Sequence, residues 1–387
     1  MENHGMTSVS TFLGDSVVYR NLNPMDDRLP TFAEIASDLG IDGTPIPRKS
    51  EPDYARVMAA LLRHAAALST GRASIRRLIY VGDTQMNDGT AFVNLCEAGG
   101  WPGWAFIGSE DQGPANVKLV TQKGRTLYLA NRWSMLRDFE EHCKEIGFAI
   151  DEEAAVIVDL DKTALGARGR NDHVINRARV EAVRQTVEAL LGNAYDAKGF
   201  EASYHLLNQT EFHPFTTDNQ DYLAYLCLIL GSDAFALPAL VEDIRSGHLQ
   251  SFSQFLEEVE TRSSDLPERL HHLHQDIYRR VKAGDPTPFK GFRYNEYRET
   301  VKRMGHLPPD ARVSTLLAHE IVITYEVCEL ALAWRERGTV LFGLSDKPDE
   351  ASIPTETLAE QGYQAIHRTP THIVGEGALA LDEASAR

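Results

Sequence analysis

Two aspartates stand one residue apart directly after a short apolar stretch. Residues 154–158, Ala-Ala-Val-Ile-Val, are followed by Asp159, Leu160 and Asp161. An apolar run of this length, rich in β-branched residues, predicts a buried parallel strand, and ligands of open α/β sheets bind at the carboxyl ends of such strands. Two carboxylates this close repel each other, so a cation or a shared proton is expected beside them. We therefore expect a functional site at the tip of this strand.

Two further apolar stretches end in polar residues in the same way. Residues 77–81 predict a strand that leads into Gly82-Asp83 and, five residues later, Asp88. Residues 339–344 predict another strand, which ends at Ser345. Lys49 comes just before a predicted helix over residues 53–68, where its ammonium group could reach an active-site edge.

Together these residues resemble the motifs of the haloacid dehalogenase-like (HAD) phosphohydrolases. The first motif of that family, DxDxT after an apolar strand, is similar to Asp159-Leu160-Asp161-Lys162-Thr163. The fourth motif, GDxxxxD, resembles residues 82–88, and Lys49 precedes it in the order usual for the third motif. Ser345 at a strand end resembles the second motif. Lys347 competes with Lys49 for the lysine role, and we prefer Lys49 because the usual pattern has no lysine after the second motif.

The motifs occur in an unusual order along the chain. In most family members DxDxT comes first and GDxxxxD last, whereas here residues 82–88 precede residues 159–163. The simplest account is a circular permutation in which residues 122–153 join the two parts, with a crossover helix over residues 133–146. Such a permutation is physically allowed because the termini of compact domains often lie close together.

The resemblance implies a metal-assisted reaction. Mg²⁺ would be held by Asp159, Asp83 and the main-chain carbonyl of Asp161, with Asp88 supporting the site. Asp159 would attack phosphorus to form an aspartyl-phosphate, and Asp161 would act first as general acid and then as general base.

The remaining motif residues would bind and position the phosphoryl group. Lys49 and Ser345 would stabilise the charge on the transferring group, and Thr163 would hold the constellation in place together with Asp88. Arg168 and Arg170, in the glycine-rich loop after the first motif, are candidates for binding a substrate anion.

The predicted fold is α/β, with a Rossmann-like parallel sheet as its core and an inserted all-helical cap domain. We expect the core to comprise residues 1–168 and 313–387, and the cap to comprise residues 169–312. Helical periodicity in the cap covers residues 180–191, 222–230, 252–259 and 270–281. In the family such caps cover the pocket and select the substrate.

Other segments of the core have weaker patterns. We expect residues 1–23 to be frayed at first, with a short strand over residues 16–19, and residues 115–118 to start a closing helix or turn. Residues 316–337 predict one strongly apolar helix, and residues 382–387 a loose tail.

Histidines and aromatic residues in the predicted cap carry a weaker signal. His271, His272 and His274 do not share one helical face, so we favour a solvated helix over a metal site. Residues 212–215 and 289–294 mix aromatic and basic groups. Core packing explains the aromatics as well as contact with a substrate does.

Composition limits the function classes. The chain has 387 residues, a net charge of -17 and a pI near 5.3, which disfavours nucleic acids and anionic membranes as partners. The sequence has no apolar run long enough for a membrane span and no signal peptide, so we expect a cytoplasmic protein. The four cysteines are widely spaced, and we expect all of them to be small buried residues.

The predicted activity is therefore hydrolysis of a small phosphorylated metabolite with Mg²⁺ as cofactor. A phosphotransferase or phosphomutase would need the same acids, and a non-catalytic phospho-ligand-binding protein is the alternative from another class. The sequence leaves the substrate and the oligomeric state open.

Overall fold

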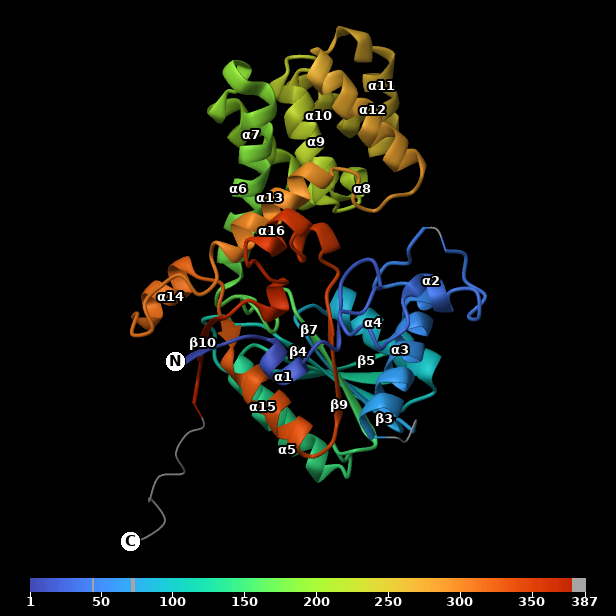
Figure 1. The fold of residues 1–387 in the computed structure, drawn as a ribbon, viewed down its shortest axis with the longest axis vertical. Coiled ribbons are helices and arrows are strands. Elements are labelled where there is room, and N and C mark those ends of the chain that lie inside the picture. The colour runs from blue at the N-terminus through green and yellow to red at the C-terminus, as the bar shows by residue number, and fades with distance from the viewer. Residues whose placement is uncertain (44, 71–73, 378–387) are drawn as a thin grey trace. The chain divides into compact units, whose positions relative to one another are not determined.

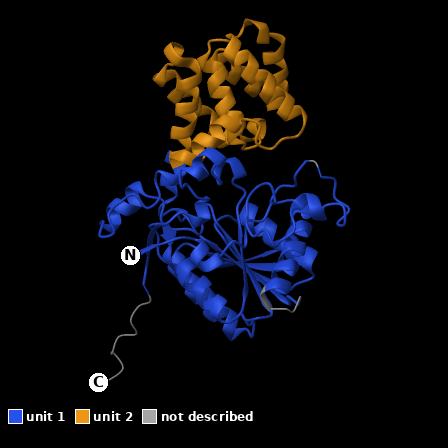
Figure 2. Ribbon diagram, viewed as in Figure 1, with its two compact units in different colours: residues 1–177, 300–387 blue, residues 178–299 orange. Residues whose placement is uncertain are grey.

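The computed structural model describes residues 1–43, 45–70 and 74–377, which form two compact units. One unit contains residues 1–177 and 300–387 and carries the β-sheets, and the other contains residues 178–299 and is helical (Figure 2). We call them the sheet unit and the helical unit. The expected tail over residues 382–387 lies outside the described residues.

The boundaries of the units differ from the predicted ones, which followed residues 168 and 312. Residues 300–312 belong to the sheet unit because their main chain is bonded to it. The amide of Ile321 donates to the carbonyl of Arg303 at 2.7 Å, and the amide of Gly305 donates to the carboxylate of Glu320 at 2.9 Å. Turn and loop residues that make such bonds carried no distinguishing pattern in the sequence.

A seven-stranded sheet forms the centre of the sheet unit, in the order β2-β9-β7-β3-β4-β6-β5. All neighbouring strands are parallel except β5, which runs antiparallel to β6 at one edge. The bounds are β2 (Val17–Val18), β9 (Val340–Leu344), β7 (Ala154–Asp159), β3 (Arg77–Gly82), β4 (Gly103–Gly108), β6 (Arg125–Ala130) and β5 (Val117–Gln122). The α/β class and the parallel sheet are therefore confirmed.

Helices cover both faces of this sheet, as Figure 1 shows. On one face α3 (Pro52–Thr70) packs against α4 (Thr90–Gly99) and β9. On the other face α15 (Tyr325–Glu336) packs against β9 and α5 (Leu136–Glu145), next to the short helix α1 (Ser10–Leu13). Every residue of β7 and β9 is buried, as expected for central parallel strands covered on both faces.

The expected closing helix or turn at residues 115–118 is wrong. These residues lead into β5, which forms a hairpin with β6 through Lys123 and Gly124, both at positive φ (46° and 75°). Two consecutive residues of positive φ are typical of the tight turns that connect antiparallel strands. The alternating exposure of β5 is weak, so its sequence carried little strand signal.

The single helix expected over residues 316–337 is also wrong. It is divided into α14 (Val313–His319), a two-residue strand β8 (Ile323–Thr324) and α15. β8 pairs with β10 (Thr371–Gly375), which pairs in turn with β1 (Glu2–Thr7). This second sheet also corrects the expected fraying of the first residues, because β1 is held by long-range pairing.

The helical unit consists of helices packed around its own apolar core. They are α6 (Asp172–Leu191), α7 (Ala197–Leu207), α8 (His213–Thr216), α9 (Gln220–Gly231), α10 (Leu237–Ser246), α11 (Phe252–Thr261), α12 (Glu268–Lys282) and α13 (Lys290–Val301). The core includes Phe212, Phe215, Phe289 and Phe292, all nearly inaccessible to solvent. Core packing thus accounts for these four phenylalanines, whereas Tyr294, which we also considered for substrate contact, is 37% exposed. No helix among the described residues has the length and apolar character needed to cross a membrane.

His274 departs from the expectation of a solvated helix. Its ring is fully buried between the hydroxyl of Tyr225, at 2.5 Å, and the carboxylate of Glu260, at 2.7 Å. Among the described residues, no cluster of three potential metal ligands includes these histidines. The four cysteines are free and buried, as predicted.

Candidate active site

The predicted site residues lie where three adjacent strands end. Asp159 is the last residue of β7, Asp83 is the first residue after β3, and Ser345 is the first residue after β9. In register, Val158 of β7 lies beside Val81 of β3, and Asp159 lies beside Leu344 of β9. Because these strands are parallel neighbours, their carboxyl ends meet at one edge of the sheet.

Three carboxylates meet at this edge and form what we call the acidic cluster: Asp83, Asp88 and Asp159. One oxygen atom from each lies within 4.8 Å of the others. Asp88 and Asp159 are almost fully buried, and Asp83 retains an exposed fraction of 9%. Asp159 thus meets two aspartates that lie 71 and 76 positions before it in the sequence, as the motif comparison required, although the chemical roles of all three stay predictions.

Lys49 bridges two members of the acidic cluster. Its Nζ atom donates to Asp88 Oδ1 at 2.6 Å and to Asp159 Oδ1 at 2.5 Å. The lysine is buried and lies in the turn before α3, the position expected from the sequence. Lys347 lies two residues after Ser345, where its amide donates to Ser345 Oγ at 3.1 Å. The contacts of Lys49 Nζ with Asp88 and Asp159 favour Lys49 for the lysine role.

Asp88 is held in place by a turn that its own motif creates. Its Oδ2 atom accepts hydrogen bonds from the amides of Asp83 (3.0 Å) and Thr84 (2.8 Å), and its Oδ1 atom accepts one from the Tyr80 hydroxyl (3.1 Å). Gly82 is required here, because a Cβ atom at this position would lie 2.6 Å from the Asp88 side chain. The structure of this turn therefore explains why Gly82 and Asp88 occur at these two positions of the motif.

The charges of the acidic cluster are only partly compensated. Burial, followed by the attraction of Lys49, determines the pKa of Asp159, and burial prevails, so this pKa is raised. Burial and the neighbouring carboxylates of Asp159 and Asp88 also raise the pKa of Asp83. For Asp88, burial is outweighed by Lys49 and by hydrogen bonds, so its pKa is lowered. Three carboxylates in contact with two cations, Lys49 and Arg168, leave one carboxyl group without a cation of its own, and either a bound proton or a further cation would compensate it.

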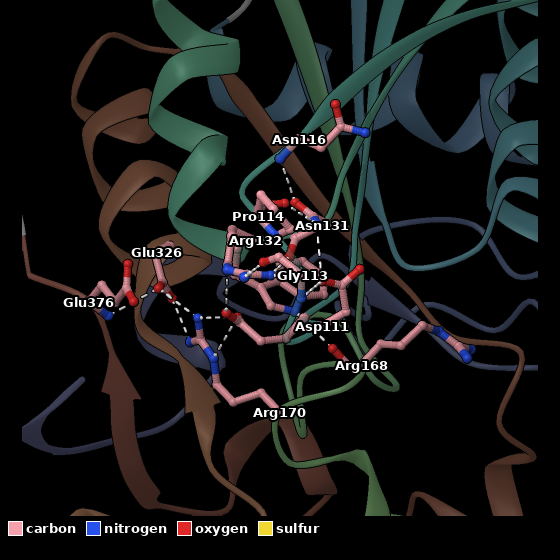
Figure 3. Close-up of polar contacts among 12 residues, drawn as sticks. Asp111, Gly113, Pro114, Asn116, Asn131, Arg132, Arg168, Arg170, Glu326 and Glu376 are labelled. Atoms are coloured by element: carbon pink, nitrogen blue, oxygen red, sulfur yellow. Dashed lines mark hydrogen bonds and ion pairs between the residues drawn. The ribbon is translucent and has the colours of Figure 1, made fainter.

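Arg168 is positioned by its main chain and reaches the cluster with its side chain. Its carbonyl accepts hydrogen bonds from the amide of Glu110 (2.9 Å) and from the indole of Trp133 (3.2 Å). Its Nε atom lies 2.5 Å from Asp83 Oδ2. Figure 3 shows the Arg168 side chain extending away from the anchored main chain. We predicted that Arg168 binds a substrate anion, whereas in the structure it contacts the carboxylate of Asp83.

Asp161 and Thr163 lie in the turn that follows β7. Lys162 between them adopts a positive φ of 67°, and the amide of Ala164 donates to the carbonyl of Asp159 at 3.1 Å. Thr163 is fully buried, and its carbonyl accepts a hydrogen bond of 2.5 Å from the Thr324 hydroxyl. The Asp161 carboxylate is not part of the acidic cluster, which agrees with a metal role for its main-chain carbonyl alone.

Two residues near the site carried no motif signal. Arg20, directly after the β2 strand region, donates from Nη1 to the carbonyl of Pro47 at 2.7 Å, and its Nε atom lies 3.5 Å from Asp346 Oδ1. It therefore links the loop before Lys49 to the turn after Ser345. Tyr54, on the first turn of α3, is fully buried, and its hydroxyl makes no hydrogen bond to any described residue. Burial raises its pKa, and Lys49 is the largest charge acting against this shift.

A buried ion pair supports the loop that carries Arg168. Arg170 forms two hydrogen bonds of 2.9 Å with the carboxylate of Glu326 and a third of 2.9 Å with Glu110 (Figure 3). Gly169 between the two arginines is required, because a Cβ atom there would lie 2.0 Å from the carbonyl oxygen of Glu110. The ion pair fixes the loop after the first motif against α15.

The donor set of the acidic cluster fits a hard divalent cation. Mg²⁺ prefers carboxylate and carbonyl oxygens and is usually held by one or two carboxylates. Asp83 and Asp159 offer such oxygens, and the pKa of both carboxyls is raised, first by burial and then by neighbouring carboxylates, whose charge a cation would offset. Comparisons with protein-family models, with curated proteins and with solved structures found no match to this chain.

Proposed function

We propose that this protein hydrolyses small phosphate monoesters with Mg²⁺ as cofactor, through an aspartyl-phosphate intermediate. The observation that carries the proposal is the acidic cluster, in which three carboxylates from the ends of two adjacent strands lie within 4.8 Å of one another. Lys49 bridges two of them. The resemblance of the four motifs to HAD phosphohydrolases supports the same chemistry.

The nucleophile in this proposal is Asp159. One of its carboxylate oxygens forms a bond to phosphorus while the bond from phosphorus to the leaving oxygen breaks. Asp161 gives its proton to the leaving oxygen, so that an alcohol departs. Asp161 then takes a proton from a water molecule, whose oxygen attacks phosphorus and releases Asp159 and inorganic phosphate. Asp83, Asp159 and the Asp161 carbonyl would hold Mg²⁺, which supplies neutralisation of the phosphate charge when bound.

Other residues stabilise and orient the transferring group. Lys49 supplies a buried positive charge beside Asp159, and the hydroxyl of Ser345 donates a hydrogen bond to a phosphoryl oxygen. Asp88 keeps Lys49 in position through its bond of 2.6 Å. Arg168, the more exposed of the two cations, turns from Asp83 to the substrate anion when substrate binds. The helical unit would serve as the cap that the resemblance implies.

The first experiment measures phosphate release from a panel of phosphate monoesters by the purified protein with Mg²⁺. We expect turnover that Asp159→Asn reduces by roughly 10³-fold or more, because the variant lacks the nucleophile. Asp138→Asn, an exposed aspartate on α5, serves as the matched control and should retain full activity. Turnover of no ester in the panel, or equal rates for Asp159→Asn and the parent, would contradict the proposal.

The same assay separates the alternatives. Product analysis in the presence of an added acceptor alcohol distinguishes hydrolysis from transfer, since a phosphotransferase would phosphorylate the alcohol. Binding of phosphate without turnover would indicate a non-catalytic phospho-ligand-binding protein.

A further inference from the structure

A pocket lies next to the acidic cluster, at the carboxyl ends of β4 and β6 and on the far side of Asp83 from β7. It has a volume of about 270 Å³ and is lined by Asp83 and Gln85 after β3, by residues at the carboxyl ends of β4 and β6, and by Asn116 and Lys118 at the start of β5. β4 and β6 follow β3 in the sheet, so the pocket lies next to Asp83, whereas Asp159 lies on the other side of that residue. Asp83 therefore lies between the pocket and Asp159, the proposed nucleophile.

One wall of the pocket is formed by the loop after β4, and this loop is fixed by its own hydrogen bonds. The side-chain amide of Asn131 donates to the carbonyl of Pro114 (2.9 Å) and to Asp111 (3.0 Å), and its oxygen accepts from the amide of Asn116 (2.7 Å). Arg132 adds bonds to Asp111 and to the carbonyl of Gly113, as Figure 3 shows. The wall is thus preformed, and a ligand need not order it.

The lining has a mixed chemical character. Ile107 and Leu129 provide apolar surface, whereas Ser109 and Asn116 provide a hydroxyl and an amide. Neither of these two polar side chains makes a hydrogen bond to another residue in the described part of the chain, so both are available to a ligand. The lining contains no aromatic side chain that could stack on a nucleobase. Its volume lies below the roughly 300–1,000 Å³ typical of sites for drug-sized ligands.

We infer that this pocket binds the leaving group of the substrate, and that this leaving group is a small hydroxylated carbon chain or ring. The inference rests on the proposed function, because it assigns the departing alcohol to a place beside Asp83. Apolar walls would contact the carbon atoms, while Ser109 and Asn116 would exchange hydrogen bonds with the hydroxyl groups. Lys118 also lines the pocket and is exposed, as Asn116 is, but it lies on the edge strand β5, where charge discourages strand pairing. We assign it no ligand.

The kinetic test compares glycerol 3-phosphate with n-propyl phosphate, which has the same carbon chain without the two free hydroxyls. We expect the parent to prefer glycerol 3-phosphate by roughly tenfold in kcat/KM, the effect of one to two hydrogen bonds. The double variant Ser109→Ala, Asn116→Leu should lose this preference, because its kcat/KM for glycerol 3-phosphate falls to about its value for n-propyl phosphate. Gln112→Met, an exposed amide on the same loop outside the pocket lining, is the control and should keep the preference.

A parent enzyme without the preference, or a double variant that keeps it, overturns the inference. A binding measurement separates this outcome from failure of the proposed function. Erythritol is titrated into the protein without Mg²⁺, and the amide resonances of Ser109 and Asn131 are followed by NMR. Saturable shifts in the parent that are absent in the double variant support the pocket even if no ester is hydrolysed, and their absence in the parent counts against it.

Discussion

Both units bury groups of charged side chains, but the two groups are compensated differently. In the helical unit, Asp221 and Glu296 are inaccessible to solvent and meet the guanidinium group of Arg293 at 2.5 and 2.6 Å. Arg179 contacts Glu296 at 3.0 Å, which gives two carboxylates and two guanidinium groups. We call these four residues the helical-unit cluster. The acidic cluster of the sheet unit has three carboxylates in contact with two cations, one of them 37% exposed.

The difference indicates what each group of charges does. A buried charge whose partners are all fixed in the chain satisfies its own hydrogen bonds and needs nothing from outside. Burial raises the pKa of Asp221 as well, although Arg293 opposes the shift, so burial alone does not distinguish the two clusters. The excess of carboxylates does distinguish them. We therefore expect the acidic cluster, rather than the helical-unit cluster, to bind an external cation.

The largest expected effect is in the helical-unit cluster. Arg293→Met leaves the carboxylates of Asp221 and Glu296 buried with one partner removed, and we expect a loss of about 3–5 kcal/mol in the free energy of unfolding. Urea denaturation followed by circular dichroism measures this loss. Arg279→Met on α12 is the control, since its side chain is 76% exposed, and it should change stability by less than about 0.5 kcal/mol. Equal stabilities of Arg293→Met and the control would show that the cluster is not structural.

The second prediction tests whether the acidic cluster takes a cation. Lys49→Met removes the cation that bridges Asp88 and Asp159. Bound Mg²⁺ would then compensate a larger part of the carboxylate charge of the acidic cluster. At 10 mM Mg²⁺ and a dissociation constant near 0.1 mM, the stabilisation would be about 2–3 kcal/mol. We expect thermal denaturation to show this rise in the parent, a larger rise in Lys49→Met, and in Arg293→Met a rise equal to that of the parent, because this variant leaves the acidic cluster unchanged.

The control for this prediction is Asp83→Asn, which removes one carboxylate from the cluster. Mg²⁺ should stabilise this variant much less than the parent. If Mg²⁺ leaves the melting temperature of the parent unchanged, or if it stabilises Asp83→Asn equally, the acidic cluster is not its binding site. The comparison between the two groups of charges would then lose its functional meaning.

The residues at the centre of the candidate site could be predicted from the sequence because each strand that carries one of them is recognisable from a short stretch of residues. β7, β3 and β9 are short apolar runs ending in Asp159, Asp83 and Ser345, and parallel strands of this type place such residues at one sheet edge. The α/β class follows from the same alternation of strands and helices. The sheet order depends on pairing between distant segments, and the sequence alone does not specify it.

The missed features depend on such distant pairing. Arg20 lies 326 residues from Asp346, and neither residue belongs to a motif. β8 has only two residues between two helices and exists because β10 pairs with it, so an apolar pattern over residues 316–337 predicted one helix instead. β5 is half exposed and is defined by its hairpin with β6. In each case tertiary pairing outweighed a weak local preference.

The smallest expected effect compares two buried tyrosines, one in each unit. The hydroxyl of Tyr225 contacts His274 at 2.5 Å, whereas the Tyr54 hydroxyl makes no hydrogen bond to any residue that the structure describes. Tyr225→Phe leaves His274 buried without this partner and should lower the free energy of unfolding by about 1–2 kcal/mol. Tyr54→Phe removes a group that has no protein partner, so we expect a change within about 0.5 kcal/mol of zero.

Activity gives the complementary measurement on the same two variants. Lys49 is the largest charge that lowers the pKa of Tyr54, so this hydroxyl lies within electrostatic reach of the proposed phosphoryl site. A buried donor without a protein partner beside an anion site is available to the anion, and its removal should reduce kcat/KM for a phosphate ester roughly threefold to tenfold. Tyr225→Phe, in the helical unit, should leave kcat/KM unchanged at temperatures where it is folded. Destabilisation by Tyr54→Phe with unchanged kcat/KM would instead indicate that its hydroxyl bonds to a buried water molecule with a structural role, and the contrast between the two tyrosines would disappear.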